Sequence, residues 1–330
     1  MGEMHTRCIG SSTIEASVVG LGTWAIGGWM WGGTDEADSV AAIRSSIDEG
    51  VSLIDTAPAY GQGLAEEIVG RAIKGRRDDV VLATKCGVVW HTQQGDHFFD
   101  YESGPAHRYL GRESIAYELE QSLRRLGTDH IDLYFTHWQD PTTPIEHTME
   151  TLLALKDQGK ILSIGASNVS ADELRTYAAT GALDAIQEEY SMVARDIETT
   201  LLPIATTHGI STLSYSSLAL GLLAGTTGPE RTFSGDDQRQ DNPRFSIANR
   251  EKVARLMEAI APIADAHDAT KAQVVIAWTL AQPGITFALC GARTAAQARE
   301  NAGAGRIELS TDDEAAISEA VATNLTDLDA

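Results

Sequence analysis

Short apolar stretches and helix-like stretches alternate along almost the whole chain of 330 residues. Eight apolar stretches have the length of a buried strand, namely Ser17–Leu21, Val51–Ile54, Val80–Thr84, Ile131–Phe135, Leu162–Gly165, Leu183–Ile186, Ile210–Ser214 and Thr286–Leu289. Strands that alternate with helices favour a parallel sheet. A closed (β/α)8 barrel has eight such strands, so the pattern predicts an α/β fold of the TIM-barrel type.

The segments between these strands place apolar residues at the spacing of a helix. The clearest are Asp35–Glu49, Gly63–Ile73, Arg112–Leu126 and Pro144–Gln158. No linker or low-complexity segment divides the chain, so we expect one domain over residues 1–330.

Each end of the chain carries an element outside this repeat. Near the N-terminus, Thr6–Ile9 and Thr13–Val19 flank a Gly-Ser-Ser turn and predict a β-hairpin ahead of the barrel. Near the C-terminus, Thr311–Val321 predicts an extra helix with Thr311 as its N-cap.

Two long polar segments interrupt the alternation of strands and helices. Val88–Leu110 and Gly225–Phe245 are far longer than a usual connection inside a compact domain. We expect both to be loops, and we expect them to emerge on the barrel face that carries the chemistry.

The formal net charge of −22 at pH 7 limits the choice of partners. An acidic surface repels phosphate backbones and anionic lipids, so nucleic acid and membranes are not expected as partners. The three cysteines form no CxxC pair, which suits a reducing compartment, and we expect a cytoplasmic protein. The nine histidines show no paired metal-ligand spacing, so no metal site is expected.

Polar residues follow three neighbouring strands of the predicted barrel. Asp55, Lys85 and His137 end these strands, and Tyr60 lies five residues beyond Asp55. Because the carboxyl ends of barrel strands meet at one face, we expect the four side chains to lie together. Tyrosine alone is a poor proton donor at neutral pH, since its ordinary pKa is about 10. A nearby lysine would lower that pKa, a carboxylate would hold the lysine, and a histidine would orient a carbonyl oxygen.

Each of these residues also has an ordinary explanation. A lone aspartate at a strand end is usually a cap, a lone lysine is usually solvated, and a lone tyrosine usually packs. Four such residues in chain order at neighbouring strand ends are harder to explain in this way. A proton relay without a metal or a covalent nucleophile suits carbonyl reduction by hydride from a bound cofactor.

Three motifs around these positions resemble the aldo-keto reductases. They are Leu53–Gly61, Ala83–Lys85 and Thr136–Trp138, and the resemblance runs from about Thr6 to Gly305. It implies that the tyrosine of the first motif is the general acid and base.

The same resemblance gives the other three catalytic positions their roles. Asp55 and Lys85 would tune the acidity of Tyr60, and His137 would orient the substrate carbonyl.

The resemblance also implies a site for NADPH, with NADH as the alternative cofactor. The residues it assigns to the cofactor are Gly22, Thr23, Trp24, Asp55, Ser167, Asn168, Gln187, Tyr215, Ser217, Leu218, Gly221, Leu222, Gly291, Arg293, Gln297, Glu300 and Asn301. Ser167, Asn168 and Gln187 would hold the nicotinamide amide. Tyr215 would stack on the nicotinamide ring, and the backbone of Ser217–Leu222 would cradle the pyrophosphate.

The adenosine end of this site departs from the family pattern. Arg293 suits a ribose 2′-phosphate, because a planar guanidinium can bind phosphate through two bonds. Glu300 and Asn301 would face the adenine. Some members have a lysine and an arginine where this chain has Gly291 and Gln297. One strong cation therefore remains, which favours NADPH but leaves NADH open.

Tryptophans gather after the first, third and fourth strands. The residues expected to bind substrate are Trp24, Trp31, Tyr60, Trp90, His137 and Trp138. Loop tryptophans can also cover a barrel rim without binding a ligand. A wall of this kind fits an aromatic or aliphatic carbonyl, or a sugar whose apolar face stacks on a ring. The segment Val88–Leu126 most resembles the bacterial branch that contains sugar- and inositol-related reductases.

Two other functions are compatible with a barrel of this kind. Some aldo-keto reductase relatives are regulatory subunits of potassium channels, which use the barrel as a nicotinamide-binding module with little turnover. A barrel hydrolase is a third interpretation, and it would need a catalytic carboxylate pair. The sequence leaves open the natural substrate, the direction of the reaction, its stereochemistry and the oligomeric state.

Overall fold

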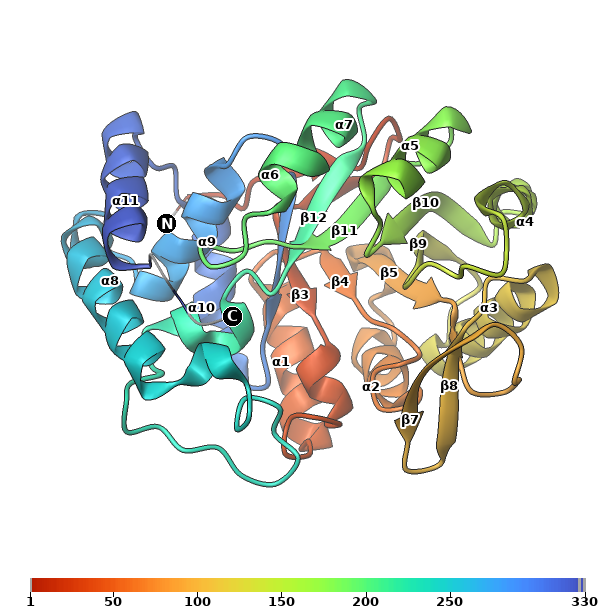
Figure 1. Ribbon diagram of the computed structural model, residues 1–330, viewed down its shortest axis with the longest axis horizontal. Helices are drawn as coiled ribbons and strands as arrows, with labels where there is room; N and C mark the ends of the chain where they lie inside the picture. The colour runs from red at the N-terminus through yellow and green to blue at the C-terminus, as the bar shows by residue number, and fades with distance from the viewer. Residues whose placement is uncertain (1, 326–327, 329–330) are drawn as a thin grey trace.

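The computed structural model describes residues 2–325 and 328. At its centre, eight parallel strands close into a barrel (Figure 1). In order around the barrel they are β3 (Val19–Gly22), β4 (Leu53–Asp55), β5 (Val81–Cys86), β9 (Ile131–Thr136), β10 (Ile161–Ser167), β11 (Ala185–Glu189), β12 (Ser211–Tyr215) and β13 (Phe287–Gly291). Each predicted apolar stretch overlaps one of these strands, so the (β/α)8 prediction is confirmed. Residues 1, 326–327 and 329–330 of the expected domain lie outside the described residues.

Alternate side chains of the strands fill the barrel interior, as the two-residue period of a strand requires. Leu53, Leu133 and Phe287 belong to this buried cluster. A β-carbon added at Gly165 would lie 2.3 Å from the ring of Phe135, so a glycine on β10 makes room for the phenylalanine on β9. The interior is therefore a packed core, so we expect a site for a ligand at the strand ends.

Helices form the outer layer (Figure 1). They are α1 (Glu36–Asp48), α2 (Leu64–Ile73), α3 (Arg112–Leu126), α4 (Ile145–Asp157), α5 (Ala171–Ala179), α6 (Ile197–Thr200), α7 (Leu202–Thr207), α8 (Ile247–Ala266), α9 (Lys271–Ala281), α10 (Ala295–Gly303) and α11 (Thr311–Asn324). The four helices predicted from apolar spacing correspond to α1 to α4. Within residues 2–325 and 328, every helix is too short or too polar to span a membrane.

The extra C-terminal helix is confirmed as α11, but its predicted cap is wrong. The N-cap is Ser310, whose hydroxyl accepts a hydrogen bond from the amide of Asp313 while the Asp313 carboxylate accepts one from the Ser310 amide. This reciprocal capping box leaves Thr311 as the first helical residue. Helix α8, which the sequence did not predict, packs against α11 at one side of the barrel (Figure 1).

The N-terminal hairpin is also confirmed. Strand β1 (Thr6–Cys8) pairs antiparallel with β2 (Glu15–Ser17). Ile9 and Ala16 are buried in the same cluster as the barrel interior, so the hairpin closes the end of the barrel where the strands begin. The predicted functional side chains therefore lie at the opposite end of the barrel, where the strands end.

The prediction that Val88–Leu110 is a loop is wrong. This segment forms a three-stranded antiparallel sheet of β6 (Val88–Val89), β8 (Gly104–Arg108) and β7 (Asp96–Tyr101). Its apolar side chains pack with tryptophans from other loops, and this contact is invisible in the segment's own polar composition. In contrast, Gly225–Phe245 contains only the short 3-10 helix η4 (Pro243–Phe245), as expected of a loop.

Two glycines set how closely the loop after β4 approaches the loop after β3. The latter begins with the 3-10 helix η1 (Trp24–Gly27). A β-carbon at Gly27 would lie 2.6 Å from the carbonyl carbon of Tyr60, and one at Gly61 would lie 2.3 Å from the carbonyl oxygen of Gly27. Gly61 also has a φ of +66°, a conformation that glycine adopts without strain. The backbone beside Tyr60 is therefore fixed by contact with η1.

Gly27→Ala is expected to lower the free energy of unfolding by about 1–3 kcal/mol, because the added methyl group overpacks this contact. Gly228→Ala is the matched control, since its added β-carbon meets nothing within 4 Å. Equilibrium denaturation in urea would compare the two variants with the wild type. Equal stability of the two variants would contradict the role given to the glycine contact.

Candidate functional site

A buried ion pair forms the centre of the site. The ammonium nitrogen of Lys85 on β5 lies 2.8 Å from both carboxylate oxygens of Asp55 on β4, and it also donates to the carbonyl oxygen of Thr56 at 2.9 Å. The Lys85 side chain has no exposed surface. Strands β4 and β5 are neighbours with Asp55 opposite Ala83, so the pleat of the two strands brings the acid and the base together. All three ammonium donors are satisfied.

Tyr60 and His137 complete the predicted group of four. The Lys85 nitrogen lies 5.0 Å from the centre of the Tyr60 ring. The His137 ring meets the Tyr60 ring edge-on, with ring centres 5.7 Å apart. The backbone amide of His137 donates to the carbonyl of Cys86, which continues the pairing of β5 with β9. The fold therefore brings together the four residues that the sequence placed at neighbouring strand ends.

The pKa of Tyr60 is shifted in the direction opposite to the one predicted from the sequence. Burial raises the pKa of Tyr60 well above its ordinary value, and the nearby negative charge of Asp55 raises it further. The net shift of the Tyr60 pKa is therefore opposite to the lowering predicted from the presence of Lys85. Burial lowers the pKa of Lys85, and its pairing with Asp55 opposes that shift. At neutral pH, Tyr60 therefore carries its proton.

His137 is held in its neutral form. Burial lowers its pKa well below the ordinary value, and the positive charge of Lys85 acts in the same direction. A neutral imidazole still has one N–H, so His137 can donate a hydrogen bond to a substrate oxygen. A protonated tyrosine beside a neutral histidine donor is suited to delivering a proton to a carbonyl oxygen.

The residues expected to hold a nicotinamide amide meet between β9 and β12. The side-chain nitrogen of Asn168 donates to the His137 carbonyl at 2.9 Å, and its side-chain oxygen accepts from the Tyr215 hydroxyl at 2.8 Å. The Ser167 hydroxyl donates to the carbonyl of Gln187. Gln187 itself donates its amide to Asp55 at 2.7 Å. Gln187 thus belongs to the ion-pair network in this structure, a contact that the sequence did not predict.

The segment expected to cradle a pyrophosphate has an unusual backbone. Ser216, Ala219 and Leu220 have left-handed φ values of 55°, 47° and 56°, and Gly221 has a φ of 89°. Left-handed residues next to right-handed ones turn successive N–H groups toward one side, which is how backbone nests bind anions. Of the other residues expected here, Ser217 and Leu222 have buried side chains, so they offer backbone rather than side-chain atoms.

The expected residues after β3 are tied to the catalytic group. Thr23 donates its hydroxyl and its amide to the carbonyl of Asp55, at 2.9 and 3.0 Å. Gly22 lies opposite Asp55 in the pairing of β3 with β4. The Trp24 ring lies nearly parallel to the Tyr60 ring, with centres 6.3 Å apart.

At the expected adenosine end, Arg293 contacts protein. Its guanidinium donates to the carbonyl oxygens of Trp31 at 3.0 Å and Gly33 at 2.6 Å. Gln297 accepts from the Arg293 amide, and Asn301 donates to the carbonyl of Gly291. These contacts shape the turn between β13 and α10.

Further contacts at this end come from Asp236 in the long loop Gly225–Phe245. Its carboxylate accepts from the amides of Met30 at 2.9 Å and Gly32 at 2.8 Å. Within residues 30–33, Arg293 therefore binds backbone carbonyl oxygens and Asp236 binds backbone amides. No sequence pattern marks Asp236, because its partners are backbone amides far away in the chain.

The tryptophans expected to bind substrate form two groups. Trp24 and Trp31 meet edge-on at 5.5 Å beside Tyr60. Trp90 and Trp138 instead contact the three-stranded sheet, where Trp90 meets Tyr101 at 5.7 Å and Trp138 meets Phe98 at 5.2 Å. The second group forms because Val88–Leu110 is a sheet rather than a loop.

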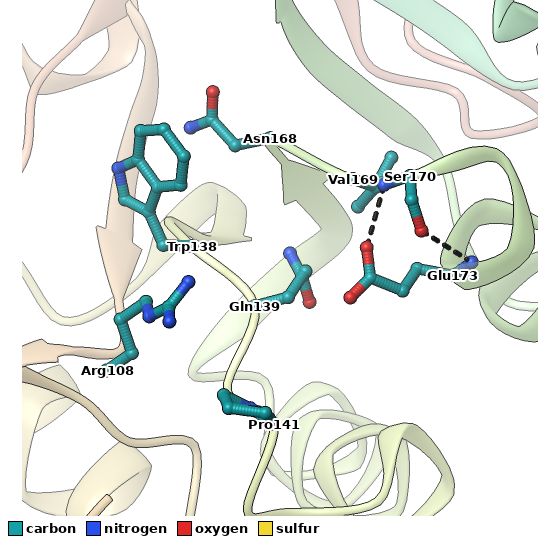
Figure 2. Close-up of a pocket in the computed structure, with 8 residues that line it drawn as sticks. All are labelled: Arg108, Trp138, Gln139, Pro141, Asn168, Val169, Ser170 and Glu173. Atoms are coloured by element: carbon teal, nitrogen blue, oxygen red, sulfur yellow. Dashed lines mark hydrogen bonds between the residues drawn. The ribbon is translucent and has the colours of Figure 1, made fainter. Parts of the chain in front are cut away.

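A cavity of about 440 Å³ lies beside Asn168, one of the residues expected to hold a nicotinamide amide. Figure 2 shows Arg108 and Trp138 on one side of it and Ser170 and Glu173 on the other, with Asn168 at its edge. Arg108, which the sequence offers as a possible polar contact in the segment Val88–Leu110, brings a positive charge to this wall. Its signal was weak, since a single arginine in a polar segment is ordinary.

Two buried carboxyl groups were also missed. Glu188 on β11 accepts a hydrogen bond from the amide of Val169 at 3.0 Å, and Glu118 on α3 accepts one from the amide of Gly87. The available signal for Glu188 was an acidic residue two positions after the apolar Ile186, near the end of a buried strand. Among residues 2–325 and 328, no three His, Cys, Asp or Glu side chains are grouped so that they could hold a metal ion.

Comparison with curated proteins identifies relatives of this arrangement. The chain is 44% identical over 297 residues to the aldo-keto reductase YhdN of Bacillus subtilis. This match covers 89% of the chain and 86% of the relative. It is 40% identical over 311 residues to the NADH-specific methylglyoxal reductase of Escherichia coli, which covers 92% of this chain and 94% of the relative.

Solved structures share the fold. A glycerol dehydrogenase from Gluconobacter oxydans superposes with a TM-score of 0.87 at 35% identity, over 97% of this chain and 96% of that one. An aldo-keto reductase from Klebsiella pneumoniae in complex with NADPH has a TM-score of 0.71 at 28% identity, over 97% and 95% of the two chains. The model of the aldo/keto reductase family matches residues 18–322, and the chain therefore belongs to that family.

Proposed function

We propose that the protein reduces an aldehyde or a ketone to the alcohol with a reduced nicotinamide dinucleotide, and that Tyr60 donates the proton. The observation that carries this proposal is the buried cluster in which Lys85 pairs with Asp55 below the Tyr60 ring while His137 faces the same ring. Membership of an oxidoreductase family supports the same reaction class.

Each residue of the cluster has a separate task in this reaction. His137 donates to the substrate carbonyl oxygen and orients it toward Tyr60. The Tyr60 hydroxyl then gives its proton to that oxygen as the alcohol forms. Lys85, fixed by Asp55, places a positive charge beside the phenolate that remains and stabilises it. Alcohol oxidation follows the same path in reverse, with the phenolate accepting the proton.

The cofactor residues support a dinucleotide along the same face of the barrel. A reduced nicotinamide, when bound, supplies the hydride. Ser167 and Asn168 would hold its amide, Tyr215 would cover its ring, and the left-handed backbone at Ser216–Gly221 would receive the pyrophosphate. NADPH is the proposed cofactor and NADH the alternative. The names of the relatives include both, with NADPH in the Klebsiella complex and NADH in the Escherichia coli reductase.

The substrate is proposed to be a small carbonyl compound from the cytoplasm. The Trp24–Trp31 pair beside Tyr60 supports an apolar contact near the reacting carbon. The cavity bounded by Trp138 and Arg108 would receive the end of the substrate away from the carbonyl. Methylglyoxal and glycerol, which the names of two relatives specify, are small enough for such a site.

Tyr60→Phe is expected to lower kcat by about 10²–10⁴-fold, the usual contribution of a general acid. Binding of NADPH should stay unchanged, because the hydroxyl acts on the substrate. The assay follows loss of reduced-nicotinamide absorbance with methylglyoxal and an activated aromatic aldehyde. Tyr117→Phe, at an exposed tyrosine on α3, is the control and should keep full activity. Retention of most of the activity by Tyr60→Phe would show that another group is the acid.

The pH dependence of kcat follows from the two shifted groups. Carbonyl reduction needs Tyr60 protonated, and the pKa of Tyr60 is raised, so the rate should fall only above about pH 10, the ordinary value for tyrosine. The pKa of His137 is lowered, so His137 keeps one charge state above about pH 6.5 and its titration should not affect the rate there. We therefore expect a plateau between these limits at saturating substrate, measured by initial rates. Alcohol oxidation, which needs the phenolate, should rise with pH over the same interval.

Arg293→Ala is expected to raise the Kd of NADPH about ten- to hundredfold more than that of NADH, because only NADPH presents a 2′-phosphate to the guanidinium. Loss of the bonds to Trp31 and Gly33 affects both cofactors, so the ratio of the two changes isolates the phosphate contact. Arg299→Ala, at an exposed arginine of α10, is the control. Equal losses for both cofactors would mean that Arg293 serves only the loop.

A further inference from the structure

The turn that carries Asn168 is held by three consecutive backbone amides. The amide of Asn168 donates to the Gln187 carbonyl at 3.3 Å, that of Val169 to the Glu188 carboxyl at 3.0 Å, and that of Ser170 to the Glu173 carboxyl at 2.7 Å. The first of these bonds is long, and the third belongs to the capping box of α5. The middle bond comes from a side chain on β11.

Asn168 needs such support because its backbone is left-handed, with a φ of 56°. A residue other than glycine adopts this conformation at a cost, although asparagine tolerates it better than most. The conformation directs the Asn168 side chain toward both the His137 carbonyl and the Tyr215 hydroxyl. If the peptide that follows Asn168 could rotate, both contacts would be lost together.

From this geometry we infer that Glu188 is a positioning residue for Asn168. Glu188 holds the peptide between Asn168 and Val169, and it thereby keeps the Asn168 side chain where it would bind the nicotinamide amide. The inference rests on the proposed function, since it assumes that Asn168 meets the nicotinamide amide. Figure 2 shows the other side of the same turn, where Val169 and Ser170 line the cavity. Glu188 thus stabilises a wall shared by the cofactor site and the cavity.

The charge state of Glu188 suits this role. Burial raises its pKa to about 8, the amide hydrogen bonds oppose that rise, and the nearby carboxylate of Glu173 adds to it. At neutral pH the carboxyl group is mostly uncharged, and its carbonyl oxygen can accept the amide hydrogen bond. An uncharged glutamine has the same length and the same acceptor, so it should replace Glu188.

The test compares two ligands on Glu188→Ala and Glu188→Gln. The ligands are NADPH and 2′-phosphoadenosine 5′-diphosphoribose, which has no nicotinamide, and binding is measured by titration calorimetry. We expect Glu188→Ala to raise the Kd of NADPH about tenfold, the effect of losing one hydrogen bond that fixes a conformer, and to leave the Kd of the second ligand unchanged. Glu188→Gln should bind both ligands like the wild type.

Asp184→Ala provides the matched control. Asp184 is also a buried carboxylate that accepts a backbone amide of the neighbouring strand, from Ile164 at 3.0 Å, but it directly precedes β11 at the opposite end of the barrel. This variant should lose stability without losing affinity for either ligand.

Three outcomes would overturn the inference. Equal losses of affinity for both ligands in Glu188→Ala would show a general structural role. No loss of affinity in Glu188→Ala would show that the turn is stable without the Glu188 hydrogen bond. A loss of affinity in Glu188→Gln equal to that in Glu188→Ala would show that the hydrogen-bond acceptor is not what matters. Failure of the proposed function looks different, because the wild type would then neither bind NADPH nor oxidise it with any carbonyl.

Discussion

The buried pair of Lys85 and Asp55 is the interaction on which the site depends. An ammonium with no exposed surface cannot remain charged unless its desolvation is offset. Here two carboxylate oxygens and one carbonyl oxygen accept hydrogen bonds from its three N–H groups. Removing one partner of such a pair commonly costs about 3–5 kcal/mol, since the other charge is left buried and unpaired. Gln187 adds a third strand to the network by donating to Asp55. The positions of β4, β5 and β11 are thus coupled through one carboxylate.

This coupling explains why the chemistry and the fold are difficult to separate. The hairpin closes one end of the barrel, the interior is packed, and the residues of the candidate site lie at the carboxyl end of the strands. There the backbone adopts conformations that are costly for residues other than glycine, with left-handed residues at Asn168 and at Ser216, Ala219 and Leu220. Strain of this kind persists where surrounding contacts determine the structure, and it collects where ligands are held.

The sequence predicted what depends on periodicity and on strand ends. Eight strands, the hairpin and the last helix have local signals, and the grouping of the four residues proposed as catalytic follows from the rule that strand ends meet. What the sequence could not supply are contacts between distant segments. The sheet within Val88–Leu110 forms because its apolar side chains pack on tryptophans from other loops. The raised pKa of Tyr60 depends mainly on burial of its side chain, and the extent of that burial cannot be inferred from the order of residues.

Arg293 illustrates the same limit at the other end of the site. A motif assigned it to a phosphate, yet in the folded chain it also anchors the loop that carries Trp31, whose ring meets Trp24 beside Tyr60. The proposed adenosine end and the proposed substrate wall are therefore joined through one side chain and two aromatic contacts. Under the proposed function, a change in cofactor contacts at Arg293 would be felt at the wall that receives the carbonyl. Cofactor choice and substrate fit would then not be independent properties of this barrel.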